Sequence, residues 1–254
     1  MPLRSIPAMP ASAPSFDQPL YEIVRAGIVD RLRTGVWVAG DRLPPEPELA
    51  RLFGVGIGTI RRAVEQLVAE RLLTRRAGRG TEVARFTDDH AFDLYFNYVD
   101  AAGTPVKVTA ELLSFAKERA TARFAALFGI ERGGSIVRVE NLRRMDGVPV
   151  MLDRLWIPTK VFADLSAQDF AARRGSIYGY YQERYGVSVV RVSEDLTAAE
   201  ADDVVAGAFG LKPGAAVLQV ERTAYTFQDQ PVEFRRRYVD TRHCAYRNVR
   251  GLQD

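Results

Sequence analysis

The spacing of apolar residues and glycines between positions 53 and 67, FGVGIGTIRRAVEQL, constrains the fold of this chain more than any other stretch. Gly54 is typical of a helix C-terminus, because glycine adopts the left-handed backbone conformation without steric cost. Beyond it, one helical face carries four apolar residues, which are Ile60, Ala63, Val64 and Leu67. The stretch therefore predicts a helix, a tight turn and a second helix, which is the spacing of a helix-turn-helix.

The flanking residues extend this pattern. Apolar residues every four positions predict a helix over residues 19–34, and further helices are predicted over 46–53 and 58–70. Two short strands joined by a Gly78-Arg79-Gly80 turn follow. Three helices and a hairpin over residues 17–84 predict a winged helix-turn-helix. Seven arginines against three glutamates within residues 61–85 suit a polyanion, although a solvated helix face gives a similar count.

The remainder of the chain, residues 92–250, predicts an α+β domain. One hairpin is predicted around Asp146-Gly147 and another turning at Asp229-Gln230. Helices are predicted beside these strands, including one over 177–186 capped by Ser176 and one over 198–210. Antiparallel hairpins separated by helices indicate an antiparallel sheet covered by helices. Residues 1–16 are predicted to be a disordered tail, and residues 85–91 a linker.

Composition narrows the possible classes of function. The 254 residues include one cysteine, Cys244, and two histidines, His90 and His243. No intramolecular disulfide can form, which favours the cytoplasm. No apolar run reaches the ~18 to 20 residues of a membrane span, and the N-terminal residues have no continuous apolar segment typical of a signal peptide. No catalytic, metal or cofactor site is visible, so we do not expect an enzyme.

An ordered series of motifs resembles the GntR family of transcription regulators, in the HutC-like branch with a UTRA effector domain. In the first part they are PLYEIVRAGIVDRLRTGVWVAGDRLPPEPELARLFGV, GTIRRAVEQLVAERLL and RRAGRGTEV. In the second they are RMDGVPVMLDRLWIP, SIYGYYQERYGVSV and LKPGAAVLQVERTAYTFQDQPVEF. The resemblance implies a C-terminal antiparallel sheet like that of chorismate lyase. It also implies a homodimer, a double-stranded DNA operator, a small-molecule effector that is often anionic, and repression as the outcome.

The resemblance also indicates DNA-contacting residues, with two departures. The family has arginine at the positions of Pro47 and Ile57, so two base-reading groups are replaced. Because each such arginine contributes ~1–3 kcal/mol of discrimination, we expect an altered operator or weaker specific binding. Glycine and isoleucine offer closer backbone approach or contact with thymine methyl groups. The residues that we expect to contact DNA are Thr59, Arg61, Arg62, Arg75, Arg76, Gly78, Arg79 and Gly80.

The resemblance likewise indicates an effector pocket. The arginine pair of the family is Asn141 and Arg143 here, and strand alternation places both on one face. The loss of one arginine favours a carboxylate, an amine-bearing or a more neutral ligand over a sugar phosphate. The helix that begins after Ser176 offers backbone N–H groups to an anion. The expected effector-binding residues are Asn141, Arg143, Asp153, Ser176, Tyr178, Glu233 and Tyr238, the last on the other face of its strand.

Two alternatives stay open at this point. In one, the chain is a metabolite sensor whose DNA-binding head has lost its sequence specificity. In the other it is an enzyme using Arg143 and Glu233, which the lack of a nearby histidine base, activated nucleophile or metal cluster disfavours. His243 and Cys244 are adjacent, but neighbouring residues on a strand point to opposite faces.

Overall fold

The computed structural model describes residues 19–70, 72–76, 78, 80–85 and 96–248. The chain divides into two compact units, residues 1–86 and 87–254, and each is described by itself. The tail predicted for residues 1–16 and most of the linker predicted for 85–91 lie outside the described residues.

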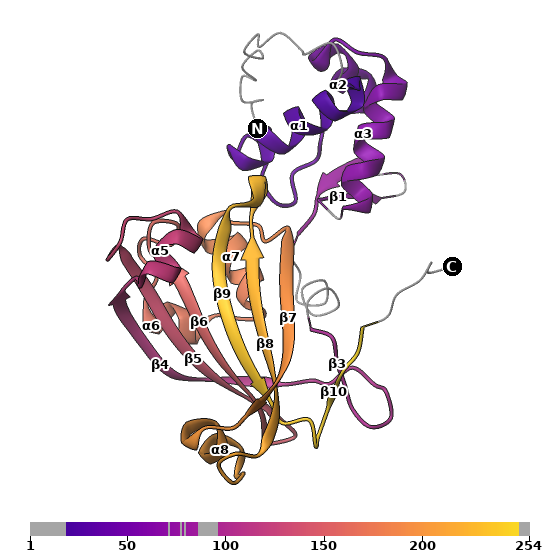
Figure 1. The fold of residues 1–254 in the computed structure, drawn as a ribbon. Helices are drawn as coiled ribbons and strands as arrows, with labels where there is room; N and C mark the ends of the chain where they lie inside the picture. The colour runs from indigo at the N-terminus through magenta and orange to yellow at the C-terminus, as the bar shows by residue number, and fades with distance from the viewer. Residues whose placement is uncertain (1–18, 71, 77, 79, 86–95, 249–254) are drawn as a thin grey trace. The chain divides into compact units, whose positions relative to one another are not determined.

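The first unit contains three helices followed by a hairpin (Figure 1). The elements are α1 (Leu20–Arg33), α2 (Glu46–Phe53), α3 (Ile57–Ala69), β1 (Leu73–Arg76) and β2 (Gly80–Val83). β1 and β2 pair antiparallel, and an isolated bridge from Arg42 to Glu82 adds a third chain segment to the hairpin. The predicted winged helix-turn-helix is confirmed, with helix boundaries within one residue of the prediction.

The core of this unit forms from the apolar faces that the periodicity predicted. Val24 and Ile28 of α1 are buried against α3, whose Ile60, Ala63 and Leu67 are fully inaccessible. Arg31 is also buried, because its guanidinium lies 4.8 Å from the centre of the Phe53 ring and donates to the Gly27 carbonyl. Burial lowers the pKa of Arg31. The aliphatic part and the planar guanidinium of Arg31 therefore pack as part of the core.

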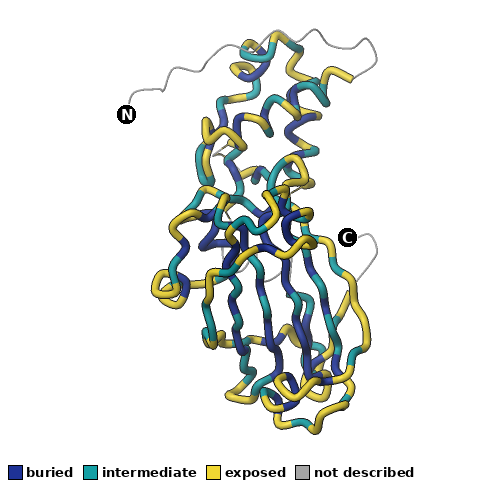
Figure 2. Tube along the Cα trace, turned by 60° about the vertical axis from the view of Figure 1, so that its left-hand side comes forward, coloured by how far each residue is buried: buried dark blue, intermediate teal, exposed yellow. Residues whose placement is uncertain are grey.

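The second unit is built on a six-stranded antiparallel sheet in the order β4-β5-β6-β9-β8-β7 (Figure 1). The strands are β4 (Thr109–Arg119), β5 (Ser135–Met145), β6 (Val148–Pro158), β7 (Arg191–Glu200), β8 (Ala216–Tyr225) and β9 (Pro231–Val239). Within the described residues, four helices accompany them: α5 (Ala122–Phe128), α6 (Ala167–Ala172), α7 (Ile177–Tyr185) and α8 (Asp203–Phe209). The predicted α+β class is confirmed. Buried residues run along the central strands (Figure 2).

The helices are divided between the two faces of the sheet. On one face Phe234 of β9 packs with α5, and Tyr238, on the same side of that strand, packs with α8. On the other face Glu233 of β9 contacts two tyrosines of α7. Strand alternation thus gives β9 one aromatic face and one charged face.

Local sequence signals are confirmed at several turns and caps. The Ser176 hydroxyl caps α7 by accepting from Gly179 N–H. Asp146 and Gly147 both have positive φ, as the tight turn between β5 and β6 requires. The second hairpin turns one residue earlier than predicted, with Gln228 and Asp229 left-handed and a short 3-10 turn over Phe227–Asp229.

One predicted helix is shorter than expected. Residues 198–200 continue β7, where Ala198 and Ala199 pair with Leu218 and Val217 of β8. The helix begins only after Asp202, whose carboxylate accepts from Val205 N–H. Cross-strand pairing outweighs the helix preference of these residues, because strand preference depends strongly on the neighbouring strand.

A small second sheet closes one end of this unit. β3 (Tyr98–Val99) pairs with β10 (Ala245–Tyr246), and Tyr98 packs with Val150, Met151 and Cys244. Burial raises the pKa of the Cys244 thiol to about 11, so it stays protonated at neutral pH. No helix within the described ranges is long and apolar enough to cross a membrane.

Candidate functional sites: the basic head and the arginine-lined pocket

The N-terminal end of α3 has few side chains of its own. Its N-cap is Gly56, which makes no side-chain cap hydrogen bond. A Cβ built at Gly56 or Gly58 would meet no atom within 4 Å. Between these glycines Ile57 is 44% exposed, whereas Ile60 one turn later is fully buried. The helix therefore begins with one exposed apolar side chain, which lies between two glycines that carry no side chain.

Behind this tip, Glu46 of α2 connects α3, the second helix of the helix-turn-helix, to the wing, which is the hairpin of β1 and β2. Its carboxylate accepts from Arg61 Nε and Nη2 at 3.2 Å and from Arg75 Nη2 at 3.3 Å. Both arginines stay exposed, with 59% and 43% of their side chains accessible. Arg75 also lies 3.7 Å from Glu65. The structure thus brings together Arg61 and Arg75, two predicted DNA contacts from separate elements.

The other predicted DNA contacts lie in different environments. The Arg62 guanidinium lies 4.0 Å from the centre of the Tyr21 ring on α1, and Arg76 pairs with Glu82 across the hairpin. Thr59 is half-buried at the start of α3. Gly78 and Gly80 have φ of +70° and +85°, so the turn itself requires glycine at both positions. Arg79 lies outside the described residues.

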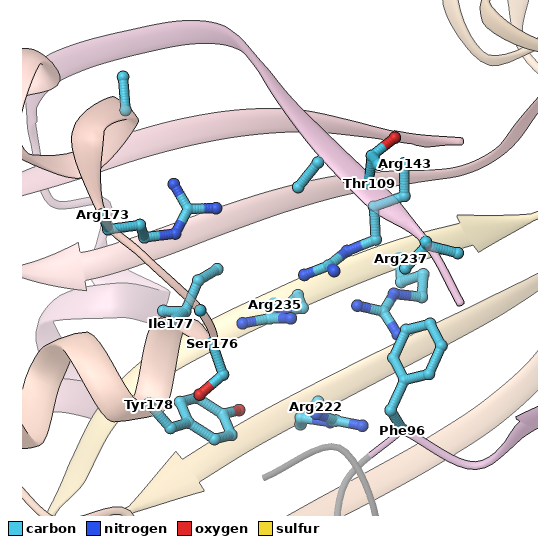
Figure 3. Close-up of a pocket in the computed structure, with 14 residues that line it drawn as sticks. Phe96, Thr109, Arg143, Arg173, Ser176, Ile177, Tyr178, Arg222, Arg235 and Arg237 are labelled. Carbon is cyan, nitrogen blue, oxygen red and sulfur yellow. The ribbon is translucent and has the colours of Figure 1, made fainter. Parts of the chain in front are cut away.

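A cavity of about 460 Å³ lies in the second unit, between the charged face of the sheet and the start of α7. Arginine side chains surround this space, and Arg173 and Arg143 enter it from opposite sides (Figure 3). A cavity of this size holds a small metabolite. Its lining includes the arginines Arg143, Arg173, Arg222, Arg235 and Arg237, together with Phe96, Thr109, Ser176, Ile177 and Tyr178.

Strand alternation explains how three of these arginines reach the cavity. In the FRRRY stretch of β9, Arg235 and Arg237 face the pocket. Arg236 between them faces away and donates to Glu221 at 2.9 Å. Arg222 of β8 is the register partner of Arg235, so the two lie side by side across the sheet. The pocket therefore receives two alternate residues of β9 and one residue of the adjacent strand β8.

Three carboxylates hold these arginines in place. Asp153 is fully buried and accepts from Arg143 at 2.7 Å and from Arg237 at 2.5 Å. Glu233, also fully buried, accepts from Arg235 at 2.8 Å. Glu233 further accepts from Tyr181 at 2.7 Å and Tyr178 at 3.4 Å, and Glu194 accepts from Arg222 at 2.7 Å. Among the described residues, five guanidinium groups face these three carboxylates, which leaves two positive charges in excess.

The direction in which each pocket arginine's pKa is shifted indicates which of these cations lack full compensation by a carboxylate. Burial opposes the charges of Arg235 and Arg237, but the adjacent Glu233 and Asp153 outweigh it and raise both pKa values. Burial lowers the pKa of Arg143 to about 10, in spite of Asp153. Burial also lowers the pKa of Arg173, whose buried Nε has no hydrogen-bond partner among the described residues. Arg143 and Arg173 are thus the least compensated cations of the pocket.

The predicted effector residues divide into four groups. Arg143, Ser176 and Tyr178 line the pocket, and Asp153 and Glu233 lie buried in contact with its arginines. Asn141, two residues before Arg143 on β5, is fully buried, and its amide has no hydrogen-bond partner among the described residues. Tyr238 does not line the pocket. It packs with α8 on the opposite face of the sheet.

Four pocket arginines were missing from the prediction, which relied on Arg143 as its one cation. They are Arg173, Arg222, Arg235 and Arg237. The alternation of FRRRY was a usable signal for two of them. No group of three or more His, Cys, Asp or Glu side chains in the described part of the chain is arranged to hold a metal ion.

A winged helix-turn-helix joined to a separate domain with a charged metabolite-sized pocket defines a two-domain DNA-binding transcription regulator. Comparison with known families agrees. The family described as bacterial regulatory proteins, gntR family, matches residues 20–83, and the UTRA domain matches residues 104–244. The chain belongs to the GntR family of regulators that carry a UTRA domain, with histidine utilization and other repressors among its relatives. This is a family of transcription regulators rather than of enzymes.

Individual relatives support the assignment over most of the chain. The transcriptional repressor NagR of Bacillus subtilis is 26% identical over 208 residues, 82% of this chain and 84% of the relative. The histidine utilization repressor of Klebsiella aerogenes is 31% identical over 164 residues, 64% and 67% of the two chains.

Solved structures show the same fold. The ligand-binding domain of a GntR-family regulator from Bordetella bronchiseptica is 30% identical with a TM-score of 0.59. That match covers 61% of this chain and 96% of the other. PhnF from Mycobacterium smegmatis, at 22% identity and a TM-score of 0.53, covers 91% of this chain and 100% of that one, and shows the fold alone.

Proposed function

We propose that this protein is a homodimeric repressor whose affinity for its operator changes when an anionic metabolite binds between Arg143 and Arg173. The observation that carries the proposal is the excess of two positive charges around the cavity. A buried cation without a counterion is costly, and a ligand with carboxylate or phosphate groups supplies the missing charge. This charge excess favours an anion over the neutral or amine-bearing ligands that the loss of one family arginine suggested.

Two features of the pocket suit an anion further. Arg143 and Arg173 approach from opposite sides, so a ligand with two separated anionic groups can contact both (Figure 3). The start of α7 also borders the cavity at Ser176 and Ile177, where helix N–H groups favour negative charge.

In this proposal, Phe96 couples ligand binding in the pocket to the DNA-binding unit. Its ring lines the cavity and lies 5.7 Å from the guanidinium of Arg143 and 5.2 Å from that of Arg237. In sequence it is ten residues beyond Phe86, where the first unit ends. A ligand that draws Arg143 toward its own charge changes this cation–π contact. In a homodimer, the linkers then alter the spacing of two heads that bind two half-sites.

The effector part of the proposal is tested by thermal unfolding of the full chain with a panel of dicarboxylates, monocarboxylates, phosphorylated sugars and neutral sugars. We expect at least one anionic compound, and no neutral one, to raise the midpoint. Arg143→Gln and Arg173→Gln should each weaken the binding of that compound about tenfold or more. The matched control is Arg236→Gln, which removes the same charge from the opposite face of β9 and should leave ligand affinity unchanged. Equal losses in all three variants, or no response to any anion, would overturn the anionic-effector proposal.

The DNA part is tested by selecting duplexes from a random-sequence pool and measuring their binding across a salt series. We expect selected duplexes to bind at least 10²-fold more tightly than scrambled ones at moderate salt, and the responding anion to change that affinity. Light scattering or sedimentation should give a dimer. Binding that depends on salt but not on sequence would instead identify a metabolite sensor with a degenerate head.

A further inference from the structure

Ile57 occupies an unusual position for a large apolar side chain. It is the first residue of α3 and is 44% exposed, while the core of its unit is already complete around Ile60, Ala63 and Leu67. A single exposed isoleucine is common on protein surfaces. Here, however, it lies on the helix that a helix-turn-helix inserts into the major groove, at the end that contacts base edges.

The same helix face carries the cations that would contact DNA. Ile57 and Arg61 are four residues apart, so they lie one above the other on α3. Glu46 connects Arg61 to Arg75 of the wing, which places a second exposed cation beside this face. An apolar tip flanked by cations matches the major groove, in which thymine methyl groups are the apolar feature and the surrounding phosphates are anionic.

The fold does not require glycine at either position beside Ile57, although glycine is a common N-cap residue, as Gly56 is here. Gly56 has an ordinary extended conformation with φ −67° and ψ 151°, so other residues are sterically allowed there. Side chains at Gly56 and Gly58 would meet only open space. Gly58 lies within the helix, where glycine costs ~1 kcal/mol relative to alanine. The absence of a side chain at both positions leaves the helix backbone open to close approach by a partner.

We infer that Ile57 reads the C5 methyl group of a thymine in each half-site, and that Gly56 and Gly58 allow the groove to approach closely enough for this contact. The inference rests on the proposed DNA binding. It makes Ile57 a specificity-determining residue that selects thymine by apolar contact. An isoleucine forms no hydrogen bond with guanine, so the preferred operator differs from that of an arginine-bearing relative at this position.

The test uses duplexes selected by the full chain and replaces each thymine in turn with deoxyuridine, which removes only the methyl group. At one position in each half-site, the replacement should weaken wild-type binding roughly fourfold, the effect of losing one buried methyl-sized contact. The Ile57→Ala variant should bind the thymine and deoxyuridine forms equally well. Val38→Ala, which shortens another exposed apolar side chain of the same unit, is the control and should keep the wild-type discrimination. Ile57→Arg should move the preference at that position from thymine to guanine, because arginine pairs with guanine O6 and N7.

The failures of the two proposals are distinguishable. If selected duplexes bind specifically but every deoxyuridine replacement affects wild type and Ile57→Ala equally, the thymine contact is refuted while sequence-specific regulation stands. If no sequence is enriched from the pool, both sequence-specific DNA binding and the thymine contact are refuted. Equal urea-unfolding midpoints for Ile57→Ala and wild type ensure that a change in binding does not reflect unfolding.

Discussion

The guanidinium of Arg143 donates to the buried carboxylate of Asp153 at 2.7 Å across the neighbouring strands β5 and β6. Asp153 also accepts from Arg237 of β9. One carboxylate therefore orients cations from both adjacent strands while neutralising only one of them. This relationship makes Asp153 important for folding and leaves the pocket positively charged.

Removal of the Asp153 charge should strongly destabilise the protein. Asp153→Asn leaves buried arginines without their carboxylate, which costs about 3–5 kcal/mol of unfolding free energy. The matched control is Asp229→Asn, which removes the same charge from a pair with Arg191 whose carboxylate is 77% exposed. That change should cost no more than ~1 kcal/mol. Urea unfolding measures both, and equal losses would contradict a structural role for the buried pair.

Acid should weaken the same contribution. Burial alone would raise the pKa of Asp153, but the charges of Arg237 and Arg143 outweigh it and hold the pKa well below its usual range. A carboxyl whose pKa is lowered on folding stabilises the protein fully above its unfolded pKa of about 3.9, and less as the pH falls below that. The difference in unfolding free energy between wild type and Asp153→Asn should therefore be constant between about pH 5 and 8 and shrink below about pH 4. A difference that grows in acid would contradict this sign.

The tyrosines of α7 should contribute unequally to stability. Tyr181 donates to Glu233 at 2.7 Å, whereas Tyr178 donates to the same carboxylate at 3.4 Å. A hydrogen bond to a charged group contributes about 1.5–3 kcal/mol. Tyr181→Phe should thus lower the unfolding free energy by about 2 kcal/mol, and Tyr178→Phe by less than half of that. The reverse order, measured by chemical denaturation, would show that the shorter contact is not the stronger one.

Glu46 should restrain DNA binding by the cations it joins. Glu46→Gln frees Arg61 and leaves Arg75 with Glu65 alone, so affinity for non-operator duplex should rise about threefold or more and depend more steeply on salt. Glu48→Gln removes an equal charge from an exposed position on the same helix, and should have a smaller effect. Fluorescence anisotropy at several salt concentrations compares the DNA affinities of the two variants. Identical increases in affinity would mean that net charge alone matters.

Gly58 and Gly54 should respond oppositely to alanine. Gly58 is helical with open space around its Cβ position, so Gly58→Ala should raise the unfolding free energy by about 0.5–1 kcal/mol. Gly54 ends α2 with φ +64°, so Gly54→Ala should lower it by about 1 kcal/mol. If Gly58→Ala proves stabilising and also weakens operator binding, then glycine at this position serves recognition at the expense of stability. Unchanged operator binding would contradict the close approach proposed here.

The sequence predicted those parts of the fold that depend on neighbouring residues. The helix-turn-helix follows from the apolar periodicity of two helices and from Gly54, which ends the first of them. The β5–β6 hairpin follows from Asp146-Gly147, and the start of α7 follows from the Ser176 cap. Each depends on backbone geometry within a few residues, which local chemistry largely determines.

Most of the pocket could not be predicted in this way. Arg222 and Arg235 become neighbours because β8 and β9 pair, and Asp153 joins them only because β6 lies on the other side of β9. The alternation in FRRRY indicates two faces, but the face that α7 covers is decided by tertiary packing. Pairing with β8 likewise extends β7 through Glu200, where local preference indicated a helix.

The arrangement of β9 has a consequence for how this domain evolves. A single-residue insertion or deletion within the strand would turn Arg235 and Arg237 toward α5 and α8, and Phe234 and Tyr238 into the cavity. Such a register shift buries two cations among aromatic rings, takes Arg235 away from Glu233 and leaves Asp153 with Arg143 as its counterion. A change in the chemistry of the pocket should therefore come from substitutions one by one along this strand, with its length unaltered.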